Sequence, residues 1–137
     1  MRLIRKIFRM VRKNRFHYSP LIEVRIDNNR LISNLRVYQK EFPSCEIVPV
    51  LKSNAYGHGL VEVAHILDTC CVPFFVVDSY FESLMLRNEG IKTSLLVIGH
   101  TPLETMLKSK LSNVAFTISD SQQLKELCVS LKRPQHF

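Results

Sequence analysis

Residues 74–98 decide the fold of this chain, and they read FFVVDSYFESLMLRNEGIKTSLLVI. Short apolar runs at 74–77 and 94–98 open and close this stretch, as expected of strands buried in a sheet. Between them, apolar residues from Phe81 onward recur at helical spacing, and Gly90 is a natural C-terminal cap. A strand, a helix and a strand in this order predict two parallel strands joined by a right-handed crossover.

The same alternation continues on both sides of this unit. Further apolar runs predict strands at residues 21–26, 47–51 and 114–118. Segments of helical spacing separate the runs, with Asp27 as an N-cap and with helices expected near residues 28–38, 60–67, 103–108 and 121–131. Because no hairpin signal interrupts the pattern, the fold class is predicted to be α/β, built from parallel βα repeats.

Composition and cysteine content narrow the class of protein. The chain is 46% hydrophobic and 23% charged, as is usual for globular domains. Its longest stretch without Asp, Glu, Lys or Arg is residues 93–103, which is too short to span a bilayer. The four cysteines lack the spacing of metal ligands, so we expect no metal site. They are predicted to be small buried hydrophobes in a reducing compartment, and hence in the cytoplasm.

The net charge of +7 is concentrated at the N-terminus. Residues 2–15 hold seven basic residues, whereas residues 16–137 hold 12 basic and 12 acidic ones. On a helix, the apolar residues of this segment share one face, so residues 1–20 are predicted to form a basic amphipathic leader. It could contact an anionic membrane surface weakly, pack on the body or extend as a solvated tail. No nucleic-acid motif accompanies it, so nucleic acid is not an expected partner.

Residues 50–59, VLKSNAYGHG, place a lysine directly after a predicted strand. In parallel α/β folds, reactive groups sit at the carboxyl ends of strands, and partial desolvation there lowers a lysine's pKa toward the nucleophilic neutral form. Lys52 could therefore condense with a carbonyl such as that of pyridoxal phosphate, and Tyr56 with Gly57 and Gly59 could hold an anionic group. A lysine reaching solvent beside an ordinary turn is the alternative, and this short spacing alone favours it.

The same decapeptide closely resembles the pyridoxal-phosphate attachment motif of bacterial alanine racemases. The resemblance extends over residues 21 to about 131 and includes FFVVD at 74–78, LRNEGI at 86–91 and LLVIG at 95–99. It implies that residues 21–137 are an incomplete N-terminal part of a pyridoxal-phosphate-binding (β/α)8 TIM-like barrel. The strand at 21–26 would lie outside the barrel proper. Ser53, where alanine is common in the family, is a minor departure.

The resemblance also implies an activity. Lys52 would bind pyridoxal phosphate covalently and act as one of two bases that interconvert L- and D-alanine, an isomerase reaction that supplies D-alanine for the cell wall. Tyr56 would hydrogen-bond the cofactor's phosphate. The family acts as a homodimer, in which a tyrosine from the other subunit's second domain is the second base. Because that domain and half of the barrel would follow residue 137, we expect this chain alone to be a fragment without useful activity.

Other functions stay open from the sequence. A racemase of serine or another amino acid would share this half of the site. A non-catalytic pyridoxal-phosphate carrier has a related barrel, although its lysine motif lacks NAYGHG. A membrane-surface or partner-binding module with a degenerate barrel is the third possibility. Asp78 and Glu82 lie four residues apart at a predicted helix start, so we expect them to be capping residues rather than an acid/base pair.

Overall fold

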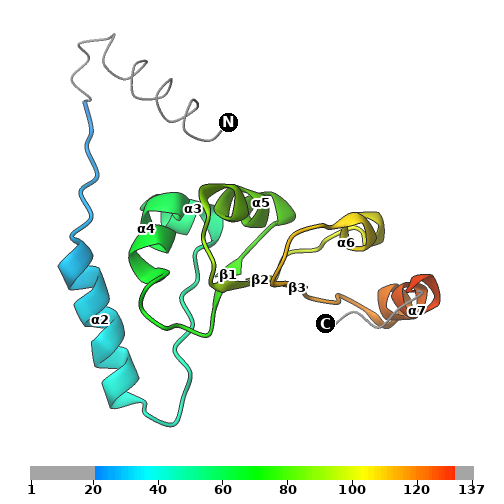
Figure 1. Cartoon of the computed structure of the whole chain (residues 1–137), viewed down its shortest axis with the longest axis horizontal. Coiled ribbons are helices and arrows are strands. Elements are labelled where there is room, and N and C mark those ends of the chain that lie inside the picture. The colour runs from blue at the N-terminus through cyan, green and yellow to red at the C-terminus, as the bar shows by residue number, and fades with distance from the viewer. Residues whose placement is uncertain (1–20, 132–137) are drawn as a thin grey trace.

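The computed structural model describes residues 21–131. The predicted basic leader, with its expected membrane-surface contact, and residues 132–137 lie outside the described residues. Within them, three helices precede the first strand, and from residue 74 to residue 130 strands and helices alternate along the chain, with the helices arranged around a small sheet (Figure 1). The predicted α/β class with parallel βα repeats is confirmed.

The sheet has three parallel strands in the order β1-β2-β3. Strand β1 (Phe74–Val77) pairs in register with β2 (Ser94–Val97), and β2 pairs with β3 (Val114–Phe116). Each crossover carries a helix, as parallel strands require. Residues 74–98 therefore form the strand–helix–strand unit that their pattern predicts.

Six helices accompany the strands in the described part of the chain: α2 (Asn28–Glu41), α3 (Lys52–Tyr56), α4 (Leu60–Leu67), α5 (Tyr80–Glu89), α6 (Leu103–Lys108) and α7 (Ser121–Ser130). Their ends follow capping chemistry. The side chain of Asp27 accepts the N–H groups of Asn29 and Arg30 at the start of α2, which confirms the predicted N-cap. Gly90 ends α5 with a φ of 90°, a conformation that costs glycine little.

The core lies between one face of the sheet and helices α4 and α5. Phe75, Val77, Leu95 and Val97 are at most 1% exposed, because alternate residues of each strand point to this face. They pack with apolar residues of the helices, including Leu60, Val63, Ala64, Leu67 and Leu86. The opposite face of the sheet is less covered: the side chains of Val50, next to β1, and of Ile98, directly after β2, are 42% and 40% exposed.

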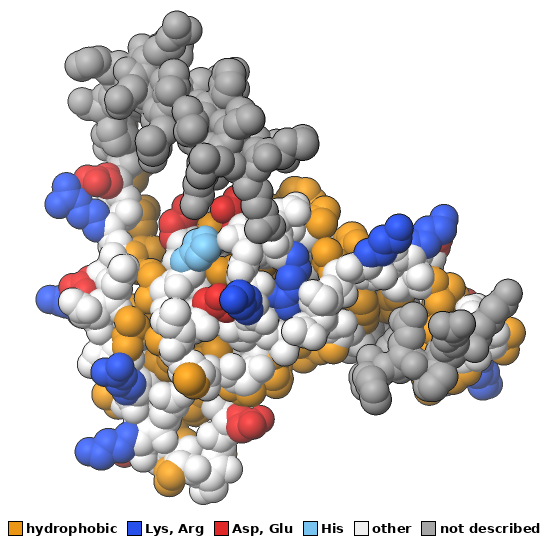
Figure 2. Space-filling view, viewed as in Figure 1, with side chains coloured by type: hydrophobic (Ala, Val, Ile, Leu, Met, Phe, Trp, Pro, Cys, Tyr) orange, Lys and Arg blue, Asp and Glu red, His pale blue; other side chains and the backbone are white. Residues whose placement is uncertain are grey.

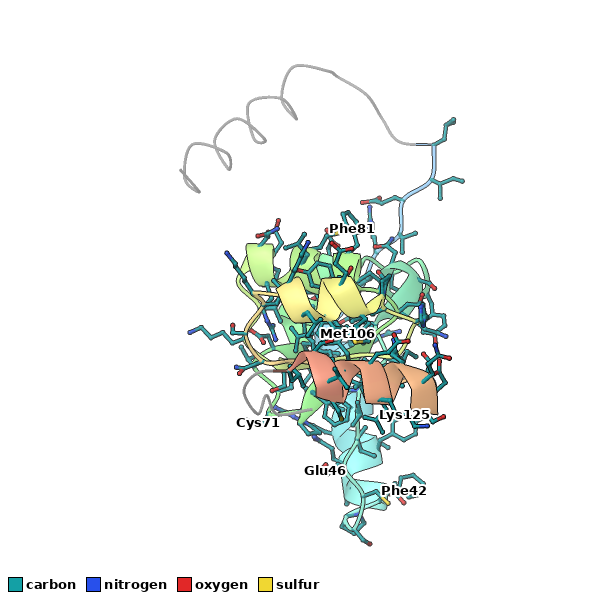
Figure 3. The ribbon with its side chains drawn as sticks, turned by 90° about the vertical axis from the view of Figure 1, so that its right-hand side faces the viewer. Phe42, Glu46, Cys71, Phe81, Met106 and Lys125 are labelled. Carbon is teal, nitrogen blue, oxygen red and sulfur yellow. The ribbon has the colours of Figure 1, made fainter. Side chains whose placement is uncertain are left out.

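Helices α6 and α7 pack beside each other at one side of the molecule. Met106 of α6 is buried next to α7 (Figure 3), whereas Leu124 and Val129 of α7 are 49% and 87% exposed. Figure 2 shows hydrophobic side chains at the surface over this part of the molecule. These two helices are therefore less covered than α4 and α5.

Two of the predicted strands differ from the structure. Residues 21–26 form no strand, and Leu21 and Val24 are 95% and 65% exposed, because no other described segment pairs with their backbone. Residues 47–51, also predicted as a strand, do not form one. They form only a single bridge, Val50 to Val76, at the open edge of the sheet.

Side-chain exposure also corrects two predictions. Of the four free cysteines, Cys45, Cys71 and Cys128 are exposed and Cys70 is half-buried, so the prediction of buried cysteines was wrong. The helix predicted from Phe81 exists, but it buries Ser83 and Leu86, and Phe81 is 66% exposed. The side of α5 that faces the core is therefore that of Ser83 and Leu86, and not that of Phe81. None of the helices within residues 21–131 is both long and apolar enough to cross a membrane.

Asp68 and Arg87 clamp the loops that lead into β2 and β3. The Asp68 carboxylate accepts the N–H of Lys92 at 3.1 Å and both the N–H and the hydroxyl of Thr93, at 2.8 and 2.7 Å. Arg87 donates to four backbone carbonyls at 2.8–2.9 Å, those of Ile91, Thr93, Ser112 and Asn113. This clamp lies at the amino ends of the strands, where residues of barrel-type folds serve stability.

The two ionisable side chains of this clamp, Asp68 and Arg87, have shifted pKa values. Burial alone would raise the pKa of Asp68, but the hydrogen bonds from Thr93 and Lys92 and the nearby charge of His65 outweigh it, so this pKa lies below its ordinary value. Burial lowers the pKa of Arg87, and the charge of Asp68 opposes that shift. Arg87 remains a cation at every pH at which a protein is studied.

Candidate functional site

Lys52 lies at the carboxyl end of the segment that borders β1. The N–H of Leu51, its neighbour, donates to the carbonyl oxygen of Val76 at 2.7 Å. Lys52 is half-buried and begins α3. The loops that follow β1 and β2, at Asp78 and Gly99, leave the sheet at the same edge. Lys52 therefore lies at the edge of the sheet where the strand-end loops leave it.

Helix α3 is a left-handed turn rather than an ordinary helix. Ser53, Asn54, Ala55 and Tyr56 have φ values of 55°, 58°, 50° and 54°. Left-handed geometry costs roughly 1–2 kcal/mol for each residue other than glycine, and asparagine tolerates it best. Four such residues in a row persist only where surrounding interactions hold them. The sequence offered no signal for this conformation beyond the two nearby glycines.

Asn54 is the centre of the bonds that close this turn. Its carbonyl oxygen accepts the N–H groups of Gly57 and Gly59 at 3.1 and 3.0 Å. Its side-chain Oδ1 accepts the N–H of Leu60, the first residue of α4, at 2.8 Å. Gly59 supplies no side-chain cap, so Asn54 caps α4 from six residues before it. Sequence reasoning missed this role because Asn54 lies outside the usual N-cap position.

His58 belongs to the same turn. Its N–H donates to the carbonyl oxygen of Ala55 at 3.1 Å, and its ring Nδ1 lies 2.8 Å from that oxygen. Both contacts make His58 part of the turn. Among residues 21–131, no group of three His, Cys, Asp or Glu side chains is placed to hold a metal ion.

Glu82 joins the turn to the loop after β1. Its Oε2 accepts the N–H of Asp78 at 2.8 Å, and its Oε1 accepts the N–H of Asn54 at 3.5 Å. Ser79 is the N-cap of α5 and accepts the N–H of Glu82 at 3.2 Å. The prediction that Glu82 is a capping residue is confirmed. It was wrong for Asp78, which precedes the cap and has an exposed side chain.

Two further contacts link the later loops of this edge. The N–H of Gly99 donates to the carbonyl oxygen of Asp78 at 2.9 Å. Gln123, only 7% exposed, accepts the N–H of Ser119 at 2.9 Å and donates to the carbonyl oxygen of Thr101 at 3.0 Å. These hydrogen bonds connect the strand-end loops one after another, from the turn after Lys52 to Ser119. The local sequence pattern does not reveal these connections.

Tyr56 is the last residue of the left-handed turn, which directly follows Lys52, and its side chain is 62% exposed. The turn thus carries an amine and a phenol on one braced segment. An amine can condense with a carbonyl carbon, and a phenol can donate a hydrogen bond to an anionic oxygen. This pair fits a ligand that has both groups, as pyridoxal phosphate does.

A cavity of about 340 Å³ lies elsewhere, at the amino ends of the strands. Its lining includes the first residue of each strand, Phe74, Ser94 and Val114. Because Lys52 lies at the carboxyl ends, this cavity is not part of the candidate site.

Comparison with known proteins agrees with this geometry. Residues 26–136 match the family model described as alanine racemase, N-terminal domain. The alanine racemase of Staphylococcus saprophyticus is 36% identical over 103 residues, which are 75% of this chain and 27% of that protein. The chain thus spans less than a third of the length of the relatives it matches.

Solved structures show the same likeness. The alanine racemase from Bacillus anthracis, solved with bound L-Ala-P, superposes with a TM-score of 0.68 at 30% identity, over 79% of this chain and 29% of that one. A histidine racemase from Leuconostoc mesenteroides subsp. sake reaches a TM-score of 0.65 at 25% identity, over 75% and 28%. The prediction of an incomplete N-terminal part of a (β/α)8 barrel is confirmed.

Proposed function

Because the chain belongs to the alanine racemase family, through its N-terminal domain, we propose that it provides the lysine half of a pyridoxal-phosphate-dependent site that interconverts L- and D-alanine. The observation that supports this proposal is the placement of Lys52 directly before the braced left-handed turn, at the carboxyl edge of the sheet. The homodimer and the cytoplasmic location of the family belong to the same proposal.

Two residues would hold the cofactor. The Lys52 amine would bind its carbonyl carbon, and the exposed Tyr56 phenol would donate to its phosphate. When bound, pyridoxal phosphate supplies an electron sink that stabilises the negative charge left on the substrate's α-carbon after deprotonation. The protein's part is to place the groups that move the proton.

Lys52 would act as the base on one face of the substrate. As a free amine it accepts the α-proton of one alanine enantiomer, and as an ammonium it returns a proton to the same face. Inversion also requires a proton-transfer group on the opposite face. Family resemblance assigns that group to a tyrosine in the second domain of the other subunit. We therefore propose that these 137 residues by themselves are insufficient for racemisation.

One experiment tests the cofactor assignment. The purified chain is incubated with pyridoxal phosphate and reduced with borohydride, and the labelled residue is located by peptide mass. We expect label on Lys52 and its loss in Lys52→Ala, with Lys92→Ala, a change at another lysine, as the control. If Lys52 takes no label, the assignment is wrong. Production of D-alanine by the chain would contradict the proposed insufficiency.

A racemase of another amino acid is the second candidate. The likeness to a histidine racemase favours it, because an N-terminal domain of this type occurs in a protein named for a different substrate. Adding alanine, serine or histidine to the chain loaded with pyridoxal phosphate would distinguish these substrates. The amino acid that displaces the Lys52 amine at the lowest concentration, followed by absorbance, is the one that this half of the site favours.

A further inference from the structure

The left-handed turn is held mostly by bonds within residues 51–60. The N–H of Ala55 donates to Leu51 at 2.8 Å, and the bonds of Asn54 and His58 close the rest. Such local bonds give the turn its shape, but they do not set its position relative to the sheet. Position requires contacts with residues far away in sequence.

Two hydrogen bonds supply such contacts, beside the packing of the buried Ala55 in the core. One is the bond from Leu51 to Val76, which precedes the turn. The other is the long bond, at 3.5 Å, from the N–H of Asn54 to Oε1 of Glu82, a residue 28 positions away, and it reaches the turn itself. Glu82 is well placed for this role because Ser79 caps its N–H and its second oxygen accepts the N–H of Asp78.

We propose that Glu82 is a positioning residue for Lys52, acting through the N–H of Asn54, an inference that rests on the function proposed above. One carboxylate oxygen accepts an N–H of the loop after β1, and the other accepts an N–H of the left-handed turn. A helix cap needs only the oxygen that faces Asp78, whereas the oxygen that faces Asn54 ties the lysine-bearing turn to α5. Glu82 therefore sets where the Lys52 amine lies at the edge of the sheet.

The substitution Glu82→Gln separates these two tasks. A glutamine side chain has one acceptor oxygen and one NH2 group, which only donates. With its oxygen on the N–H of Asp78, the NH2 group would face the N–H of Asn54, and that bond would be lost. Glu82→Ala removes both bonds. Glu104→Gln is the matched control, because Glu104 lies in the first turn of α6 and pairs with Lys108.

Three measurements on the full chain read out the result. Amide hydrogen exchange reports Asn54 and Asp78 separately, and NMR couplings report the φ angles of residues 53–56. The rate of borohydride-trapped labelling by pyridoxal phosphate, in which the amine and the aldehyde condense with release of water, reports Lys52. Labelling of Lys125 on α7 (Figure 3) is the internal reference.

In Glu82→Gln we expect the Asn54 amide to exchange about fivefold faster and Lys52 labelling to slow by a similar factor, as loss of one hydrogen bond implies. The Asp78 amide and the Lys125 labelling rate should stay as in the unchanged chain. Glu104→Gln should alter none of these values.

Several results would overturn the inference. Unchanged exchange at Asn54 in Glu82→Gln would do so, and so would loss of protection throughout α5, which would make Glu82 a helix cap alone. Unchanged φ couplings and labelling in Glu82→Ala would also contradict it. If Lys52 of the unchanged chain takes no label, the proposed function fails, and exchange at Asn54 with the φ couplings still decides the role of Glu82.

Discussion

Gly99 lies directly against the backbone of Asp78. The N–H of Gly99 donates to the Asp78 carbonyl oxygen at 2.9 Å, and a Cβ at position 99 would lie 2.2 Å from that same oxygen. No side chain fits there without moving the loop after β1. This contact joins the loops after β1 and β2, at the edge of the sheet that carries Lys52.

Gly99→Ala should therefore destabilise the chain by about 1–3 kcal/mol, the usual cost of overpacking, because the obstacle is backbone and cannot rotate away. Urea unfolding measures this difference. Gly90→Ala is the matched control. Its φ of 90° is strained for alanine, but nothing lies within 4 Å of the added Cβ, so its cost should be nearer 1 kcal/mol. An equal or smaller loss in Gly99→Ala than in Gly90→Ala would contradict the close approach.

Asn54→Ala should cost more than Asn113→Ala. Both residues have left-handed φ values, 58° and 54°, so in both variants alanine loses stability by adopting that unfavourable conformation. Only Asn54 also accepts the N–H of Leu60, and losing that cap should add about 1 kcal/mol. Thermal unfolding of the two variants gives the difference. Equal melting temperatures would show that the Asn54 side chain does not stabilise the turn.

Arg87→Lys should destabilise the chain by about 2–4 kcal/mol. A lysine ammonium cannot reproduce the planar arrangement that serves four carbonyls; the Asn113 carbonyl keeps the N–H of Leu95, but each carbonyl left unpaired costs about 1 kcal/mol or more. Arg36→Lys on the exposed surface of α2 is the control and should change stability by less than about 0.5 kcal/mol. Urea unfolding of both variants tests this, and equal effects would mean that the clamp adds no stability.

Asp68 should make stability depend on pH in the acidic range. Its pKa is lower in the folded chain than in the unfolded chain, so its stabilisation is complete above about pH 4, the ordinary carboxyl value, and is lost as the pH falls through the folded value. Asp68→Asn lacks this titration. The unfolding midpoints of the two proteins should differ most at neutral pH and converge as the pH falls through the folded pKa of Asp68, below its ordinary value.

Thr93→Val is the partial control for this prediction. It removes the hydroxyl that donates to Asp68 at 2.7 Å but keeps the backbone donors, so its pH dependence should lie between the other two. A constant difference between the unchanged chain and Asp68→Asn across the pH range would refute the linkage.

The sequence by itself determined the order of the strands and helices in residues 74–131, because periodicity and caps act between residues close along the chain. Asp27 starts a helix, Gly90 ends one, and residues 74–98 form a strand–helix–strand unit, as their pattern predicts. The lysine at the end of an apolar run was also recognisable, since the carboxyl ends of parallel strands share one edge.

Only the tertiary structure decided how that lysine is held. The left-handed turn, the division of Glu82 between two loops and the contact of Gly99 with Asp78 each depend on segments that are distant in sequence. The same reason explains residues 21–26. Their alternation suits a strand, but a strand forms only where another backbone pairs with it, and no other described segment does so.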